Sequence, residues 1–253
     1  MKIELVCALP MYNSSKIGWL ALESLCRQKG VNFNWELIIL EDGENYMGCE
    51  EILKYSDRLA SAGCVSIDYE YSSEKIPLAT KWKKIAERAS NKKSDFLLVA
   101  ADCYSQPFRL SETHEILKHS KWVNSPLGPF YHIPTESIAI FDQSCTKHPC
   151  GLNMATKTNL VIDLPSDGPA SGIDGWMFKN IEKNLKRELI TSQNFSENWK
   201  KGVDTDGFNN ISSRRYQRIK SPNEKLWKSA KPEDFLIPND IKIKLKKLKN
   251  VKK

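Results

Sequence analysis

Short apolar runs alternate with amphipathic segments along the first hundred residues. Four apolar runs predict strands; they span residues 3–9, 35–40, 65–71 and 95–101. Three segments place their apolar side chains on one helical stripe and predict helices; they are 15–29, 50–62 and a segment opened by Pro77. Because strands and helices alternate, the pattern predicts an α/β fold with a mainly parallel, Rossmann-like sheet and helices on both faces.

The pattern becomes less regular in the rest of the chain. Prolines interrupt the middle third, where we expect one strand at 137–141 and a helix that opens near Asp174. After about residue 190 the sequence is polar and rich in Asn and Ser, so 191–240 is interpreted as a C-terminal extension and 241–253 as a basic tail.

The net charge of +7 is concentrated in that tail. Residues 241–253 contain seven lysines and no acid, which leaves 31 basic against 31 acidic residues elsewhere. A basic face on the globular part is therefore not implied. Only the tail is a candidate to bind an anionic partner, either a membrane surface or a nucleic acid. The alternative is that the tail is solvated or docked locally on the protein.

The spacing of the cysteines and the length of the apolar stretches indicate in which cellular compartment the protein lies. The seven cysteines form an odd set without CxxC spacing, which favours reduced thiols. The N-terminus begins with a strand-like run, and no stretch approaches the roughly 20 apolar residues of a membrane span. These features predict a cytoplasmic protein without a transmembrane segment.

Four separated segments carry a resemblance to a known family. They are LVCALPMYNSSKIGWLALESLCRQ, LIILEDG, DFLLVAADCYSQP, and CGLNMATKTNLVIDLP followed by SGIDGWMFKNI. In their order and spacing they resemble the GT-A-type inverting glycosyltransferases of family 2, including small viral and bacterial enzymes. The resemblance covers roughly residues 1–190 and implies a catalytic core with a nucleotide-binding half at about 1–107 and an acceptor-binding half at about 108–190.

This resemblance implies transfer of one sugar from a nucleoside-diphosphate sugar to a hydroxyl of a glycan or other acceptor, with inversion. A divalent metal neutralises the departing diphosphate in such a reaction, and oxygen ligands suit Mn²⁺ or Mg²⁺. Asp102 aligns with the last acid of the family's Asp-x-Asp motif, although Ala100 replaces the first. Asp102 is therefore the expected metal ligand; the alternative is an exposed turn residue.

Donor binding is assigned to the ends of the first two strands and to the helix after Pro77. The resemblance makes Pro10 and Tyr12 walls against the base and ribose, and Asp42 an acceptor for their N–H or O–H groups. Lys81 occupies the position where relatives carry a cation that faces the nucleotide. Scaffold and turn roles, or simple solvation for Lys81, are the alternatives.

The general base is expected at Asp174, in the sequence SGIDGW. An inverting displacement needs a base within hydrogen-bond reach of the acceptor hydroxyl, and Asp174 aligns with the second of two acids found in relatives. Trp176 offers a platform on which a sugar ring could stack. The alternative for Asp174 is an N-cap of the helix.

The C-terminal extension supplies the last predicted site residues. Arg214 and Arg215 could pair with the β-phosphate if this segment closes over the donor. The Gln-x-x-Arg-Trp motif of processive synthases is absent, which favours single-sugar transfer.

Three other functions remain open from the sequence. One is a degenerate, non-catalytic sugar-binding relative, because the first acid of the Asp-x-Asp motif is missing. A nucleotidyltransferase-like enzyme shares the layered core, but it would need a glycine-rich loop after the first strand, where the chain has PMYNS. A DNA-modifying or nucleic-acid-binding protein could use the lysine tail for phosphate contacts.

Overall fold

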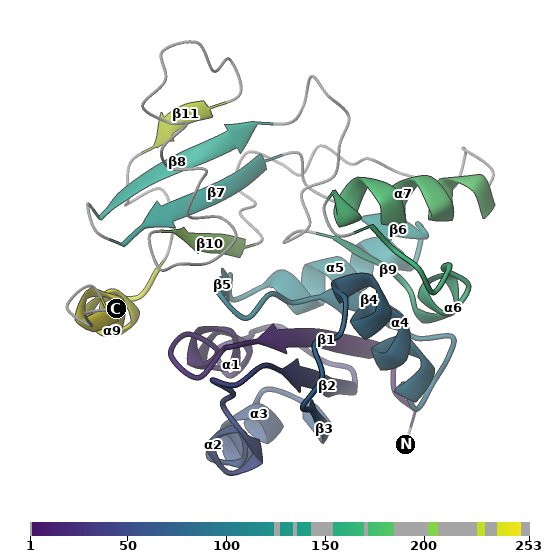
Figure 1. Cartoon of the computed structure of the whole chain (residues 1–253), viewed down its shortest axis with the longest axis horizontal. Helices are drawn as coiled ribbons and strands as arrows, with labels where there is room; N and C mark the ends of the chain where they lie inside the picture. Colours follow the sequence, from purple (N-terminus) through teal and green to yellow (C-terminus); the bar gives the residue numbers. More distant parts are fainter. Residues whose placement is uncertain are drawn as a thin grey trace.

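The computed structural model describes residues 2–123, 127–133, 136–142, 154–169, 172–184, 202–206, 227–230 and 237–248. Within these ranges the strands form two sheets, which Figure 1 shows one above the other. No helix in these ranges is long and apolar enough to cross a membrane.

The first sheet has six strands in the order β3-β2-β1-β4-β9-β6. Their bounds are β1 Leu5–Tyr12, β2 Trp35–Asp42, β3 Cys64–Ser72, β4 Asp95–Leu98, β6 Trp122–Val123 and β9 Ala155–Lys157. The pairs from β3 to β4 are parallel, while β9 runs antiparallel to both of its neighbours. All eight residues of β2 are buried, as expected for a central parallel strand covered on both faces.

Helices cover both faces of this sheet. One face packs against α1 Trp19–Leu25, α2 Cys49–Leu53, α3 Ser56–Ser61 and α5 Arg109–Leu117. The other packs against α4 Leu78–Arg88, α6 Thr158–Ile162 and α7 Ile173–Asn184. Alternate residues of β1 point into the two cores, with Leu9 in the first and Ala8 in the second. The predicted α/β class, with a mostly parallel sheet, is therefore confirmed.

Three predicted elements differ in length from those observed. The helix predicted at 15–29 begins only at Trp19, because a turn closed by the Gly18 amide on the Ser14 carbonyl precedes it. The segment 50–62 forms two short helices, α2 and α3, rather than one. The strand predicted at 95–101 ends at Leu98, because the chain turns where the Cys103 amide donates to the Ala100 carbonyl, at 3.1 Å.

The second sheet was largely missed by sequence reasoning. Its strands are β5 Cys103–Ser105, β7 Leu127–His132, β8 Ser137–Asp142, β10 Gly202–Asp206 and β11 Trp227–Ala230, in the order β11-β8-β7-β10-β5. Only β8 was predicted. β10 and β5 pair although they lie about a hundred residues apart in the chain, and such a non-local pairing leaves no local pattern.

The basic tail begins as a docked helix, α9 Asn239–Leu248, near the bottom of the second sheet in Figure 1. Ile241 and Leu245 are buried in a cluster with residues of α1, β5 and β7. Asp240 pairs with Arg27, which follows α1, while Lys246 lies 2.9 Å from Glu136, which directly precedes β8. The sequence left two alternatives to an anionic partner, a solvated segment and a locally docked one. For residues 239–248 the structure shows local docking.

Candidate functional site

The carboxyl ends of the parallel strands bring several predicted residues to one edge of the first sheet. Tyr12, Asp42 and Ser72 lie at the same register position on β1, β2 and β3. β4 pairs with β1 on its other side, so Asp102, four residues beyond Leu98, belongs to the same edge. Ligands of open α/β sheets bind at this edge.

Asp42 and Lys81 meet at this edge as a buried ion pair. The Lys81 ammonium contacts Asp42 Oδ1 and also donates to the Met11 carbonyl, at 2.5 Å. The other carboxylate oxygen of Asp42 accepts the Ile76 amide, at 2.5 Å. The side chains of Lys81 and Asp42 are 4% and 0% exposed. The pair therefore fastens α4 and the segment before it to the ends of β1 and β2.

Burial lowers the pKa of Lys81, while the adjacent Asp42 carboxylate opposes this effect by favouring the charged form. The two groups stand in direct contact. The charge of Lys81 is then neutralised within the protein. It differs in this respect from the nucleotide-facing cation that the sequence predicted.

Glu41 organises the loop beside the edge, a role that sequence reasoning did not assign. Its fully buried carboxylate accepts from the Ser14 hydroxyl, the Tyr69 hydroxyl, and the backbone amides of Met47 and Gly48. Burial, followed by the charge of Glu41, raises the pKa of Tyr69. The signal in the sequence was the acid pair itself. Two adjacent acids on one strand point to opposite faces, so each needs its own set of partners.

Gly43 and Asn13 shape the tip of the edge. Gly43 has a φ of 97°, and a Cβ placed on it would lie 2.4 Å from Asn13 Oδ1. Asn13 has a φ of 49°, a conformation that Asn adopts more readily than most residues, and its side chain accepts the Asn45 amide, at 3.1 Å. The turn residues of the Pro-x-Tyr-Asn and Glu-Asp-Gly segments therefore pack against each other and leave no room for a side chain at 43.

Aromatic side chains are exposed along this edge. Tyr12 is 51% exposed, and the Lys75 ammonium lies 4.9 Å from the centroid of its ring. Tyr46 and Tyr71 are also exposed, with ring centroids 4.5 Å apart. Pro10, two residues before Tyr12 on β1, is half-buried. The predicted walls for a base are thus accessible at Tyr12 and partly covered at Pro10.

Asp102 lies in the turn where the chain leaves the first sheet for the second. Arg109, which is fully buried, spans this turn by donating to the Leu98 carbonyl at 2.6 Å and to Ser105 Oγ at 2.8 Å. No group of three or more His, Cys, Asp or Glu residues in the described ranges could hold a metal ion. A Mn²⁺ or Mg²⁺ at Asp102 fits only a site that draws other ligands from phosphates and water, as Mg²⁺ sites commonly do.

Asp174 lies in the first turn of α7, whose first residue is Ile173. The Trp176 amide donates to the Gly172 carbonyl, at 3.1 Å, so Gly172 occupies the N-cap position and the alternative of Asp174 as N-cap is wrong. α7 packs against α4, the helix that carries Lys81.

Trp176 is half-buried. A Cβ at Gly168 would lie 3.4 Å from the Trp176 ring and 2.2 Å from Ala79 Cβ, so the ring lies beside the first turn of α4. Part of the predicted sugar platform therefore packs against the protein.

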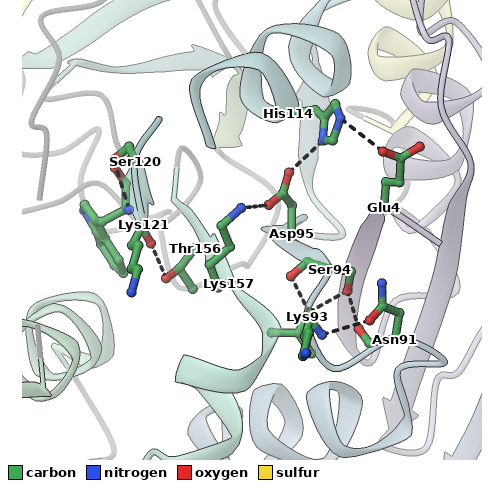
Figure 2. Close-up of polar contacts among 12 residues, drawn as sticks. Glu4, Asn91, Lys93, Ser94, Asp95, His114, Ser120, Lys121, Thr156 and Lys157 are labelled. Carbon is green, nitrogen blue, oxygen red and sulfur yellow. Dashed lines mark hydrogen bonds and ion pairs between the residues drawn. The ribbon is translucent and has the colours of Figure 1, made fainter. Parts of the chain in front are cut away.

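The opposite edge of the sheet carries a separate polar network, shown in Figure 2. Asp95, at the start of β4, pairs with Lys157 of β9 and with His114 of α5, whose Nδ1 lies 2.7 Å from Asp95 Oδ2. His114 Nε2 lies 3.9 Å from Glu4 Oε2. These contacts lie at the amino ends of the parallel strands β1 and β4, away from the candidate site. Arg214 and Arg215, by contrast, lie outside the described residues.

Comparisons with known proteins agree with this architecture. No family model and no curated protein matches the sequence. The chain is similar to S. aureus TarS 1–349 in complex with UDP-GlcNAc, with a TM-score of 0.60 and 16% identity, over 83% of this chain and 61% of that chain. It is also similar to the mannosyltransferase PcManGT from Pyrobaculum calidifontis in complex with GDP-Man and Mn²⁺, with a TM-score of 0.56 and 11% identity, over 98% of this chain and 70% of that chain.

The chain thus spans less than two thirds of the TarS fragment. At these identities the likeness shows the fold, a mostly parallel α/β architecture like that of GT-A-type glycosyltransferases.

Proposed function

We propose that the chain transfers a single sugar from a nucleoside-diphosphate sugar to an acceptor hydroxyl, with inversion at the sugar carbon. The observation that carries this proposal is the placement of Tyr12 and Asp42 at the ends of β1 and β2, with Asp102 in the turn that follows the neighbouring strand β4. That edge is where open α/β sheets bind nucleotides. The structural likeness to complexes with UDP-GlcNAc and GDP-Man supports the same class of ligand.

In this proposal the nucleoside lies against the exposed ring of Tyr12, with Pro10 beside it. The Asp42–Lys81 pair forms the buried base of this subsite, holding the Met11 carbonyl and the Ile76 amide in place. Asp42 therefore acts on the nucleoside through the strand ends that it holds in place, because both of its oxygens are already paired and buried. A polar group that is already buried and paired is costly to rearrange, which favours a preformed subsite.

Asp102 would hold the divalent metal, Mn²⁺ or Mg²⁺, together with oxygens of the diphosphate. The metal supplies charge neutralisation for the departing nucleoside diphosphate. Arg109 fixes the turn that carries Asp102, because its guanidinium bonds both the strand before the turn and the strand after it. Arg214 and Arg215 would add positive charge near the phosphates in the closed complex.

Asp174 is the proposed general base. Its carboxylate takes the proton of the acceptor hydroxyl while the hydroxyl oxygen bonds to the sugar carbon. The bond from that carbon to the diphosphate oxygen breaks on the opposite face, so the configuration inverts. Trp176, two residues further on, would contact the acceptor or donor sugar with the part of its ring that is not packed against Gly168. We expect the reaction to take place in the cytoplasm, where the free cysteines stay reduced.

A thermal-shift screen tests the proposal. UDP-, GDP-, CMP- and dTDP-sugars are each added with and without Mn²⁺, because a ligand that binds only the folded chain raises its melting temperature. We expect one nucleotide class to raise the Tm, and to do so more with Mn²⁺. A chain that responds to none of them under either condition would contradict a donor site at this edge.

A further inference from the structure

The exposed ammonium of Lys75 sits over the Tyr12 ring, the surface proposed above for the nucleoside. Lys75 belongs to the segment between β3 and α4, and its Nζ lies 4.9 Å from the ring centroid. Lys81 approaches the same ring at 5.9 Å, but it is held by Asp42 and the Met11 carbonyl. Of the two cations, Lys75 is therefore the one that can move.

None of the residues that the structure describes neutralises the charge of Lys75. Asp42 is committed to Lys81, and no carboxylate in the described ranges lies within ion-pair distance of Lys75. Lys75 and Lys81 are close enough that the charge of Lys75 contributes to lowering the pKa of Lys81. Two ammonium groups thus lie near the same ring, and the Asp42 carboxylate is paired with only one of them, so an incoming phosphate anion would reduce their repulsion.

A planar base and an ammonium cannot occupy the same face of one ring. Stacking of a nucleobase on an aromatic side chain is stronger than a cation–π contact of an exposed lysine, so the base displaces the ammonium. The released side chain is long and flexible, and a phosphate oxygen is the strongest partner that the ligand offers it.

We propose that Lys75 is the residue that selects nucleoside diphosphates over free nucleosides, by leaving the Tyr12 ring to a base and pairing with a phosphate. This inference rests on the proposed function and adds a specificity residue to it. It separates two lysines by role, because Lys81 positions the strand ends while Lys75 contacts the ligand.

NMR titrations of the full chain with UDP, uridine, GDP and guanosine test the inference, in Mg²⁺ and again in EDTA. Lys75→Met keeps the length of the side chain and removes its charge. We expect it to weaken binding of the diphosphate by about three- to tenfold, the usual range for a partly exposed charged contact. Binding of the matching nucleoside should stay the same or tighten, because the ring is no longer covered by an ammonium. Lys84→Met, an exposed lysine of α4, is the matched control and should change neither affinity.

The outcomes separate the two proposals. Equal losses for the nucleoside and the diphosphate would mean that Lys75 only packs on the ring, and would overturn its selective role, as would unchanged affinities for both ligands. Either result leaves the nucleotide site standing if the wild-type chain binds a diphosphate. A wild-type chain that binds none of the four ligands in Mg²⁺ would overturn the proposed function and the role of Lys75 together.

Discussion

The ammonium of Lys81 reaches from helix α4 to the carboxylate of Asp42 at the end of β2, and both groups are buried. Two charges taken out of water stabilise the fold only while each satisfies the other. Asp42 also accepts a hydrogen bond from the Ile76 amide, and Lys81 also donates one to the Met11 carbonyl. Its geometry therefore controls the edge on which the proposed donor site is built.

Replacing Lys81 by Met should strongly destabilise the chain. The substitution leaves the Asp42 carboxylate buried without its counter-charge, and losses of this kind are about 3–5 kcal/mol in free energy of unfolding. Urea unfolding followed by circular dichroism measures the loss. Lys84→Met, at an exposed position of the same helix, should stay within about 0.5 kcal/mol of wild type.

A double variant distinguishes the cost of an unpaired charge on Asp42 from the cost of the lost hydrogen bond to the Met11 carbonyl. Lys81→Met combined with Asp42→Asn removes both charges, so most of the stability lost in Lys81→Met should return. Equal stability in the single and double variants would show that the loss comes from the hydrogen bond between the Lys81 ammonium and the Met11 carbonyl, rather than from the unpaired charge of Asp42.

The part of the fold with local signals was predictable from the sequence. The apolar run of β2 and the stripe of Trp82, Ile85 and Ala86 on α4 each follow a single period, and the structure buries them as expected. Strand ends followed by acids also predicted that these acids would lie at one edge of the sheet. Asp42 and Asp102 are found there because parallel strands place their carboxyl ends together.

The rest of the fold and of the candidate site depended on contacts between segments that are distant in the sequence. Strands β5 and β10 pair across the chain, and the partner of a short strand cannot be read from either segment alone. The orientation of a lysine side chain also depends on residues far away in the sequence, since the three lysines at 81, 83 and 84 look alike in sequence. Only Lys81 faces the buried Asp42, and only the packed structure shows this.

Asp102→Asn should weaken the effect of the metal more than the binding of the nucleotide itself. The amide keeps the size of the side chain but removes the charge that would hold Mn²⁺. Loss of a direct ligand should cost at least as much as loss of an outer-shell partner, about 10–100-fold in metal affinity. Titration of Mn²⁺ in the presence of UDP or GDP, followed by thermal shift, measures it. Asp57→Asn, an exposed acid on α3, is the control; identical Mn²⁺ curves for both variants would remove Asp102 from the metal site.

Asp174→Asn should separate catalysis from binding. A general base contributes about 10²- to 10⁴-fold to turnover, so kcat should fall by that factor while the Kd for the donor remains nearly unchanged. Steady-state transfer assays and donor titrations on the same preparation give the two values. Asp167→Asn, an exposed acid in the segment before α7, serves as the matched control. Normal turnover in the Asp174 variant would assign the base to another residue.

Glu23 should make stability depend on pH in the acid range. Hydrogen bonds from Arg58, and then from Lys244 of α9, lower the pKa of Glu23 to about 2. A depressed pKa in the folded state stabilises above the unfolded value, near 4.5, and this stabilisation disappears as the pH falls from there toward 2.

The partners of Glu23 are about half exposed, so the contribution at neutral pH should be only about 1 kcal/mol. The difference in unfolding free energy between wild type and Glu23→Gln should therefore shrink from pH 7 to pH 3. A difference that stays constant across this range would contradict the ion-pair account.

The docking of α9 predicts opposite results for two apolar residues of one helix. Leu245 is 1% exposed in the cluster with α1, β5 and β7, whereas Ile243 is 56% exposed. Leu245→Ala should cost about 2–5 kcal/mol because it removes buried methyl groups and leaves a cavity. Ile243→Ala should stay within about 0.5 kcal/mol, since that side chain already faces water. Urea unfolding of both variants makes the comparison, and near-neutral effects for both would mean that the basic tail is solvated in solution rather than packed against α1 and the second sheet.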